Sequence, residues 1–410
     1  MNDAIAYRIA NACAALGIPV QITHAWQVGA VACYALAFSP RITVREIKAR
    51  QDDLARLVGA SITISQDETT GMVIAQARAP RRQRLLAGPN APKLCGLRVA
   101  IGRLTNGQGD AVLDFASPAH AHLLLVAATG GGKTEAIHTI LYQIARQNSP
   151  AQASLLLIDP AGNRIHEAWD SSAHLAAPVV RADLAAAVRA LEWAADLVRQ
   201  RNAERRNSPH LLVVVDEMAS LFFARDDAER ARNALATITQ LGRVAGVHAV
   251  LATQYASRET LGSPFIRANL RARLVGRVDS AQASAIACGR DGCDAHRLLG
   301  HGDFLLVDDT GARRLQVALT RPEHIAALKR APAPLRAAFL SAPPAPQKQQ
   351  EKLTPPPLED ELLRKVKEIL DKNPDASNRE LERTIFGYTG GTATTVIKRL
   401  RERLRETCAA

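Results

Sequence analysis

Short apolar runs recur along residues 92–320 of the chain, and longer segments with helical spacing separate them. Each run has the length and composition of a strand that is buried on both faces of a sheet. Strands that alternate with helices in this way are typical of an α/β fold with a parallel sheet. The predicted strands are 122–126, 154–158, 210–215, 247–252, 272–277 and 304–307. The predicted helices are 133–146, 182–204, 228–244 and 281–286.

The first 85 residues have a different pattern, which predicts a small α+β domain. Residues 44–58 carry helical spacing, with Ile47, Leu54, Leu57 and Val58 on one side. Apolar runs predict strands at 28–38, 61–65 and 71–76. We therefore expect an N-terminal domain over 1–85 and a larger α/β domain over 86–330.

The rest of the chain predicts a linker and a third domain. Residues 331–357 are rich in Pro, Ala, Gln and Lys, a composition with little tendency to fold. Within 358–410, three short helical segments with a glycine-rich turn before the last resemble a helix-turn-helix DNA-binding domain, with or without a wing. A protein-binding three-helix bundle, or a solvated helix face of mixed charge, is the alternative. The predicted DNA contacts on the last helix are Thr394, Thr395, Lys398, Arg399 and Arg401.

A glycine-rich segment follows the predicted strand 122–126 and reads A-A-T-G-G-G-K-T over 127–134. Such a turn between a strand and a helix is typical of a phosphate-binding loop, because glycines let backbone N–H groups surround a polyphosphate. Lys133 is then expected to reach the β- and γ-phosphates, and the Thr134 hydroxyl to hold Mg²⁺. The alternative is a glycine-rich surface turn. The predicted nucleotide contacts are Thr129, Gly130, Gly131, Gly132, Lys133 and Thr134.

Polar residues end two further predicted strands. Asp216 and Glu217 follow 210–215, and Gln254 follows 247–252. The carboxyl ends of parallel strands are where open α/β sheets bind ligands. Asp216 is therefore predicted to hold Mg²⁺ and Glu217 to act as the base that orients the attacking water. Gln254 could sense the γ-phosphate or position water, although an ordinary amide at a strand end is the alternative.

The composition is that of a globular protein with excess positive charge. The 410 residues are 47% hydrophobic and 22% charged, as in a globular protein of two or three domains. A formal net charge of +12 favours a polyanionic partner such as nucleic acid, although an arginine-rich proteome would give the same balance. No predicted segment spans a membrane or reads as a signal peptide, and the six cysteines form no disulfide-like framework. These features predict a soluble protein of the reducing cytoplasm.

Several ordered motifs resemble the FtsK/SpoIIIE family of DNA-translocating ATPases. Besides the phosphate loop and V-V-V-D-E, they include L-I-D-P at 157–160 and G-V-H-A-V-L-A-T-Q at 246–254. A-N-L-R-A-R-L-V-G-R at 268–277 and L-L-G-H-G-D at 298–303 also resemble family segments, as does D-D-L-A-R-L-V-G at 52–59. The resemblance covers residues 28–320. Ala127 replaces the first glycine of the family's loop. We expect a protein without the family's membrane-anchoring N-terminus.

The resemblance implies a RecA-like ATPase that forms a hexameric ring around double-stranded DNA and uses ATP with Mg²⁺. It assigns nucleotide and metal binding to Lys133 and Thr134, coordination and catalysis to Asp216 and Glu217, and γ-phosphate sensing to Gln254. Arg273 or Arg277 would supply the arginine finger to a neighbouring subunit.

The sequence therefore predicts an ATP-driven double-stranded DNA translocase that serves the transfer or segregation of a plasmid, phage or integrative element. The alternatives are a conjugative coupling or DNA-packaging ATPase that acts on single-stranded DNA, and a DNA-binding regulator that nucleotide switches. The sequence names no recombinase or transfer-machinery partner.

Overall fold

The computed structural model describes residues 3–67, 70–89, 91–162, 166–222, 225–257 and 260–328, and a few positions between 366 and 397. The chain divides into two units, Met1–Ser341 and Ala342–Ala410. In the second unit the longest described helical stretch is 366–371. The predicted linker and the predicted DNA contacts (Thr394, Thr395, Lys398, Arg399 and Arg401) lie outside the described residues, so the helix-turn-helix domain stays a prediction.

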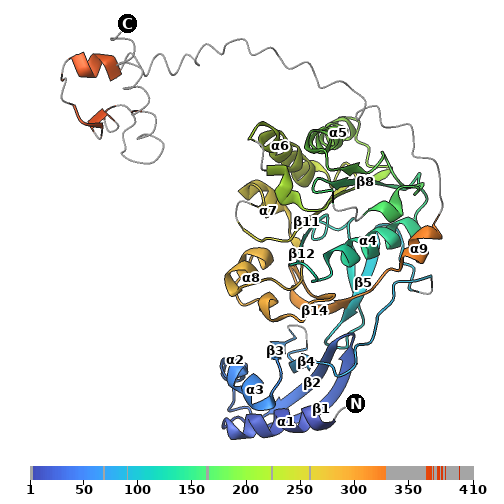
Figure 1. Ribbon diagram of the computed structural model, residues 1–410, viewed down its shortest axis with the longest axis vertical. Coiled ribbons are helices and arrows are strands. Elements are labelled where there is room, and N and C mark those ends of the chain that lie inside the picture. The colour runs from blue at the N-terminus through green and yellow to red at the C-terminus, as the bar shows by residue number, and fades with distance from the viewer. Residues whose placement is uncertain are drawn as a thin grey trace. The chain divides into compact units, whose positions relative to one another are not determined.

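The first unit begins with a four-stranded antiparallel sheet in the order β1-β2-β4-β3 (Figure 1). Helices α1 and α3 pack on one face of it, where Ile9, Leu54 and Ile64 form part of a buried cluster. Its elements are α1 (Asp3–Ala15), β1 (Val20–Val28), β2 (Val31–Phe38), α2 (Val44–Ala49), α3 (Gln51–Val58), β3 (Ile62–Gln66) and β4 (Val73–Arg78).

The single helix predicted at 44–58 is two helices. The backbone leaves the helical region at Arg50, and the side chain of Gln51 turns inward to accept a hydrogen bond from the Ile64 backbone N–H at 2.7 Å. This bond attaches α3 to the sheet. It explains why the polar residue Gln51 is buried within the apolar spacing of residues 44–58. The strand predicted at 28–38 begins at Val31, because Gly29 and Ala30 form the turn of a hairpin with β1.

A ten-stranded sheet forms the larger part of the first unit, in the order β6-β5-β14-β13-β12-β7-β11-β10-β8-β9. The six strands from β12 to β9 are parallel, and the four from β13 to β6 pair antiparallel. The strands are β5 (Arg98–Leu104), β6 (Asp110–Asp114), β7 (His122–Val126), β8 (Ala153–Asp159), β9 (Val180–Arg181), β10 (His210–Val215), β11 (Val247–Thr253), β12 (Ala272–Val275), β13 (Asp303–Asp308) and β14 (Gly311–Val317). The helices are α4 (Lys133–Gln147), α5 (Leu184–Ala203), α6 (Arg225–Leu241), α7 (Pro264–Asn269), α8 (Ala281–Cys288) and α9 (Pro322–Ala326), with short 3-10 turns at Glu167–Trp169, Met218–Phe222 and Ala295–Arg297.

Helices cover both faces of this sheet. Successive side chains of a strand point to opposite faces, so the apolar side chains of one strand pack against helices on both sides. In β7, Leu123 and Leu125 pack with α4 on one face, whereas Leu124 and Val126 pack with α5 and α6 on the other. All these side chains are fully buried. The central strands are therefore apolar throughout, which made them recognisable in the sequence.

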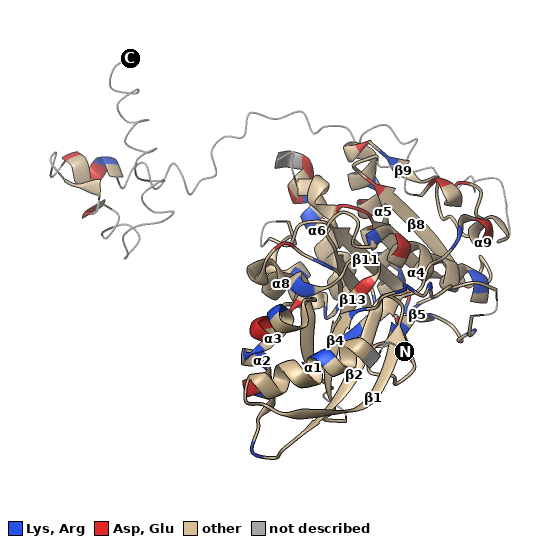
Figure 2. Ribbon diagram, turned by 60° about the horizontal axis from the view of Figure 1, so that its bottom comes forward, with Lys and Arg blue, Asp and Glu red and all other residues tan. Residues whose placement is uncertain are grey.

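The α/β fold with a parallel core is confirmed, and so are all six strands predicted in it. The sequence predicted no antiparallel part of the sheet. The strand predicted at 304–307 pairs antiparallel with β12, and β5, β6 and β14 were not foreseen. No helix among the described residues is both long enough and apolar enough to cross a bilayer. In the view of Figure 2, basic and acidic residues are interspersed along the helices of the first unit.

Buried polar contacts join the N-terminal sheet to the ten-stranded sheet. Arg314 of β14 forms an ion pair with Asp303 of β13 (2.6 Å) and donates a hydrogen bond to Gln76 of β4 (2.9 Å). Gln76 in turn donates to Thr105, which follows β5. These four side chains are buried, so the contact between the sheets is held by a polar network whose groups satisfy one another.

Candidate nucleotide-binding site

The loop between β7 and α4 has backbone conformations that require glycine. Gly130 and Gly132 adopt φ values of 76° and 104°, in the left-handed region. A Cβ on Gly131 would lie 2.8 Å from the Ala128 carbonyl oxygen, and one on Gly132 would lie 2.7 Å from the Gly302 nitrogen. The three glycines therefore let the chain turn tightly into α4, whose first residue is Lys133.

Ala127 stands where the related loops carry a glycine, and the fold accommodates it. Its side chain is fully buried, and a Cβ on Gly276 would lie only 2.8 Å from the Ala127 Cβ. Gly276, just after β12, therefore provides the space that the alanine methyl fills. Replacing the first loop glycine by alanine is compatible with the turn because the neighbouring strand end carries the glycine instead.

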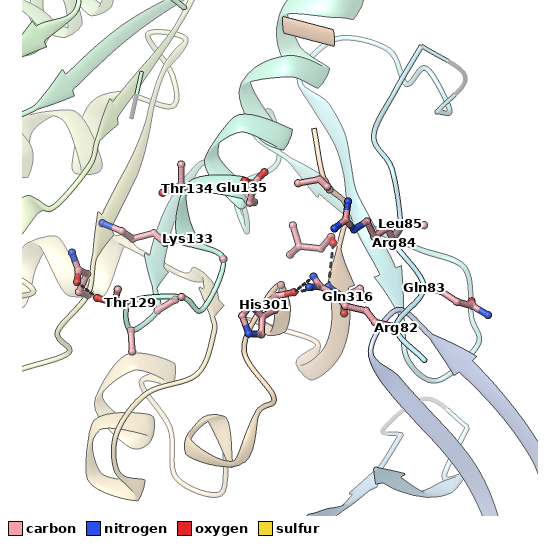
Figure 3. Close-up of a pocket in the computed structure, with 18 residues that line it drawn as sticks. Arg82, Gln83, Arg84, Leu85, Thr129, Lys133, Thr134, Glu135, His301 and Gln316 are labelled. Atoms are coloured by element: carbon pink, nitrogen blue, oxygen red, sulfur yellow. Dashed lines mark hydrogen bonds between the residues drawn. The ribbon is translucent and has the colours of Figure 1, made fainter. Parts of the chain in front are cut away.

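A second loop supports the phosphate loop from behind. The backbone N–H groups of His301 and Gly302 donate to the carbonyl oxygens of Gly130 (3.1 Å) and Gly131 (2.8 Å). The His301 carbonyl accepts hydrogen bonds from Arg82 (2.7 Å) and Gln316 (3.1 Å). The phosphate loop is thus connected to β14 and to the segment that follows the N-terminal sheet (Figure 3).

Lys133, Asp216 and Glu217 meet at the carboxyl edge of the sheet. The Lys133 Nζ lies 2.8 Å from Asp216 Oδ1 and 3.5 Å from Glu217 Oε2, and all three residues are buried. Burial raises the pKa of the Asp216 carboxyl above its ordinary value, and the Lys133 ammonium partly offsets this shift. In this arrangement the lysine charge is balanced by carboxylates, so an incoming phosphate would compete with them for it.

Glu217 is held in an unusual conformation. Its backbone φ is 66°, in the left-handed region that non-glycine residues rarely occupy. Its carboxylate accepts hydrogen bonds from the Thr253 hydroxyl (2.7 Å) and the Gln254 backbone N–H (3.1 Å). The Gln254 side chain accepts from the Thr129 hydroxyl of the phosphate loop at 2.8 Å. Glu217 and Gln254 therefore both connect the end of β11 to the site.

Oxygen donors suitable for Mg²⁺ lie next to Lys133. The Asp159 and Asp216 side chains end the neighbouring strands β8 and β10, where Ile158 pairs with Val215. Asp159 is fully buried, and neither of its carboxylate oxygens has a hydrogen-bond partner among the described residues. Two neighbouring carboxylates at the strand ends suit a small hard cation that retains several waters. Mg²⁺ would supply positive charge at the phosphates of a bound nucleotide.

The two candidate finger arginines differ in what their side chains do. The Arg273 guanidinium donates to four backbone carbonyls, those of Arg267, Leu270, Ile286 and Ala287, at 3.1–3.4 Å. It joins α7, α8 and the start of β12. Arg277 is exposed, and its carbonyl accepts from the Ala128 N–H of the phosphate loop at 2.8 Å. Of the two, only Arg277 is exposed, whereas the Arg273 guanidinium is bonded within its own subunit.

A cavity of about 500 Å³ opens beside the phosphate loop (Figure 3). Gly130, Lys133, Thr134 and Gln254 are among the residues that line it. The volume is in the range of pockets that enclose a small organic ligand. A glycine turn and a buried lysine at a helix N-terminus therefore line one cavity that can receive a nucleoside triphosphate. The lysine connects this cavity to the carboxylates of Asp216 and Glu217, which are not among its lining residues.

The sequence model of the FtsK/SpoIIIE family matches residues 97–207 and 195–258. These ranges contain the phosphate loop and the residues that end β8, β10 and β11. This ATPase domain belongs to the FtsK/SpoIIIE family. It is a P-loop ATPase domain, a class that binds ATP, usually with Mg²⁺.

Curated relatives of this chain are DNA translocases named FtsK. The protein of Sporosarcina ureae is 27% identical over 348 residues, which are 76% of this chain and 43% of the relative. That of Borreliella burgdorferi is 30% identical over 231 residues, 51% of this chain and 28% of the relative. That of Staphylococcus aureus is 30% identical over 256 residues, which are 56% of this chain and 31% of the relative. The chain thus spans less than half the length of these relatives.

Two solved structures share the fold of this FtsK/SpoIIIE domain. The pCW3 conjugation coupling protein TcpA aligns over 79% of this chain and 99% of its own, with 18% identity and a TM-score of 0.54. The cytoplasmic domain of the type VII secretion ATPase EccC from Thermomonospora curvata aligns over 57% of this chain and 30% of its own, with 25% identity and a TM-score of 0.50.

The structure brings together most of the site residues that the sequence predicted. Asp216, Glu217 and Gln254 contact the phosphate loop, and so does the Arg277 carbonyl. The Arg273 guanidinium instead donates to backbone carbonyls at the ends of α7 and α8. Sequence reasoning gave no role to Thr253, which carries the hydrogen bond to Glu217. It also missed Glu135 and the segment Arg82–Leu85, which line the cavity. Of these, only Thr253 lies in a motif that the family resemblance had marked.

Proposed function

We propose that the protein is an ATP-driven translocase of double-stranded DNA that serves the transfer or segregation of a plasmid, phage or integrative element. The observation that carries the proposal is the contact of Lys133 with Asp216 and Glu217 behind a glycine loop of the FtsK/SpoIIIE type. ATP with Mg²⁺ would replace these contacts with contacts to phosphate oxygens. The curated relatives, named DNA translocases, support double-stranded DNA as the substrate.

In this proposal each side chain has a defined task. Lys133 and the loop N–H groups bind the β- and γ-phosphates, and Thr134 and Asp216 hold Mg²⁺. Glu217 orients the attacking water, and Gln254 reports the γ-phosphate to Thr129 and β11. Copies of the chain form a hexameric ring, in which an arginine from a neighbour completes the site. Arg277 is the better of the two candidates because its guanidinium is exposed.

The DNA-gripping loops of such a ring would contact phosphates rather than bases, so binding would tolerate any sequence and weaken with salt. The predicted helix-turn-helix, with Lys398 and Arg399 among its DNA contacts, would help to load the ring on DNA or to orient it there.

Displacement of a third strand from a long linear duplex tests translocation directly. The wild-type chain with ATP should release the third strand, and Lys133→Ala should not, because the phosphates lose their main cation. Lys93→Ala removes an exposed lysine and is the matched control. Equal displacement by Lys133→Ala and wild type would contradict the site assignment.

The strand preference of ATPase stimulation separates the competing functions. A conjugative coupling or packaging ATPase would respond to single-stranded DNA, and a nucleotide-switched regulator would bind ATP without multiple turnover. The fold does not decide between them, since the coupling protein TcpA shares it. Hydrolysis that increases with duplex length would support the translocase, whereas stimulation by single strands alone would overturn the assignment of the substrate.

A further inference from the structure

The cavity beside the phosphate loop has two chemically different ends. The first end consists of loop glycines, Lys133 and Thr134, which suit a triphosphate. The second end is lined by Arg84 and Leu85 of the segment that follows the N-terminal sheet, by Glu135, and by Val317 and Leu319 after β14. A triphosphate has no aromatic or apolar surface to place at this second end, so it serves another part of the ligand.

Glu135 has an unused acceptor in this second end. It is in the first turn of α4, directly after Thr134, and its Oε2 atom is buried without a hydrogen-bond partner among the described residues. Burial also raises the pKa of the Glu135 carboxyl. A buried oxygen without a donor is costly, so a ligand hydroxyl at this point would contribute favourably to binding. Ribose hydroxyls adjoin the phosphates in a nucleotide.

The wall opposite Glu135 is fixed by backbone hydrogen bonds. The Leu319 N–H donates to the Leu85 carbonyl at 2.7 Å, and the Ala87 N–H donates to the Leu319 carbonyl at 3.0 Å. Arg82 is held by its bond to the His301 carbonyl. Leu85 and Leu319 therefore present an apolar surface of fixed position, against which a flat base can pack.

Arg84 supplies a planar cation at the same end of the cavity. Figure 3 shows Arg84 and Glu135 projecting from opposite sides, one from the connecting segment and the other from α4. A guanidinium stacks well on an aromatic ring. Arg84, Leu85 and Leu319 would together form one wall, against which a base can pack.

We propose that this end of the cavity binds the nucleoside part of ATP, with Glu135 accepting hydrogen bonds from the ribose hydroxyls and the base packed against the wall formed by Arg84, Leu85 and Leu319. The inference rests on the proposed function, since it extends the same nucleotide site. It gives the segment Arg82–Leu85, which connects the N-terminal sheet to the ten-stranded sheet, a direct contact with the ligand.

Binding of MgATP and of magnesium tripolyphosphate to the full chain, measured by calorimetry, tests the base site. Arg84→Ala should weaken MgATP at least about threefold and leave tripolyphosphate unchanged, because only ATP has a base. Arg81→Ala is the matched control, since Arg81 is exposed and outside the cavity. Equal affinity of Arg84→Ala and wild type for MgATP would overturn the assignment of the base to this wall.

2′,3′-DideoxyATP tests the ribose contact. The wild type should prefer ATP to dideoxyATP at least about tenfold, and Glu135→Ala should lose that preference. Glu323→Ala, in the first turn of α9, is the control because Glu323 is exposed. A preference that survives in Glu135→Ala would show that the hydroxyls bind elsewhere.

Hydrogen exchange gives a readout that does not depend on variants. MgATP should slow exchange at residues 82–87 more than tripolyphosphate does, and identical protection by both ligands would contradict the proposal. Failure of the proposed function is distinguishable. A wild type that binds MgATP through Arg84 and Glu135 but does not displace a third strand from duplex DNA would keep the nucleoside site and overturn the translocase.

Discussion

At Glu217, backbone strain, burial and hydrogen bonding coincide in one residue. Its left-handed backbone costs about 1–3 kcal/mol, yet the fold retains it. The Thr253 hydroxyl and the Gln254 N–H hold the carboxylate where β10 and β11 end together. Strain at a buried acid next to a phosphate loop is understandable if the position of that acid matters for chemistry.

Glu217→Gln should bind ATP and hydrolyse it at least about 100-fold more slowly than wild type, because an amide of the same shape cannot accept a proton from water. Single-turnover hydrolysis, with nucleotide binding measured in parallel, checks this. Glu229→Gln changes an exposed glutamate of α6 and should behave as wild type. Wild-type turnover in Glu217→Gln would assign the base to another residue.

Thr253 is predicted to act as a positioning residue for Glu217. Thr253→Val keeps the volume and removes the hydroxyl, so kcat should fall about tenfold while ATP affinity stays near that of wild type. Thr253→Ser restores a hydroxyl and should recover most of the rate. If Val and Ser variants are equally slow, packing at this position matters and the hydrogen bond does not.

The residues of the phosphate loop were predictable because they are contiguous and follow an apolar strand. Asp216 and Glu217 were predictable for the same reason. Thr253, Glu135 and Arg84 were not, because their role depends on which strand ends and loops meet in space. Sequence spacing alone could not choose between Arg273 and Arg277, whereas the four carbonyls around the Arg273 guanidinium distinguish them.

Among the secondary-structure elements, the central strands were predicted well and the outer ones were missed. Strands β7, β10 and β11 are apolar on both faces, and their sequences show it. Strands β1 and β14 carry polar residues at many positions, because one face of each is partly exposed or lies in the polar contact between the sheets. A mixed pattern of this kind does not distinguish a strand from a loop.

The contact between the two sheets leads to a prediction about stability. Arg314→Met should lower the free energy of unfolding by about 3–5 kcal/mol, because it leaves the buried Asp303 carboxylate without its cation. Asp303 also accepts from the Leu299 N–H at 2.8 Å, at the start of the loop that supports Gly130 and Gly131. ATP affinity should therefore fall too.

Arg297→Met is the matched control for that variant. It removes another ion pair that joins the N-terminal domain to the larger domain, from Arg297 to Asp52 at 2.6 Å. Unlike Asp303, the Asp52 side chain is 71% exposed. An exposed pair contributes about 0–1 kcal/mol. Urea unfolding of both variants checks the difference, and equal destabilisation would show that burial of the Arg314 pair has no special weight.

On the scale of the whole molecule, one connected set of contacts leads from the N-terminal sheet to the nucleotide site. Gln76 and Arg314 join the two sheets, Asp303 fixes the loop after Leu298, and His301 and Gly302 support the phosphate loop. A ligand that contacts Arg84 as well as the phosphate loop would touch both the segment that follows the N-terminal sheet and the nucleotide site. The N-terminal sheet is thus part of the first unit's response to nucleotide in our proposal, rather than an independent attachment.

The division of the chain after Ser341 leads to the last prediction. A chain that ends at Ser341 should fold and hydrolyse ATP, because the described site lies entirely within Met1–Ser341. Its affinity for duplex DNA should fall, and the slope of log K against log[salt] should decrease by about one for each DNA phosphate that the shortened chain no longer neutralises. Lys398→Ala with Arg399→Ala in the full chain should reproduce part of that change, since both would contact DNA in the predicted helix-turn-helix. Unchanged affinity and slope would exclude residues 342–410 from DNA binding, and an inactive truncated chain would make them part of the ATPase.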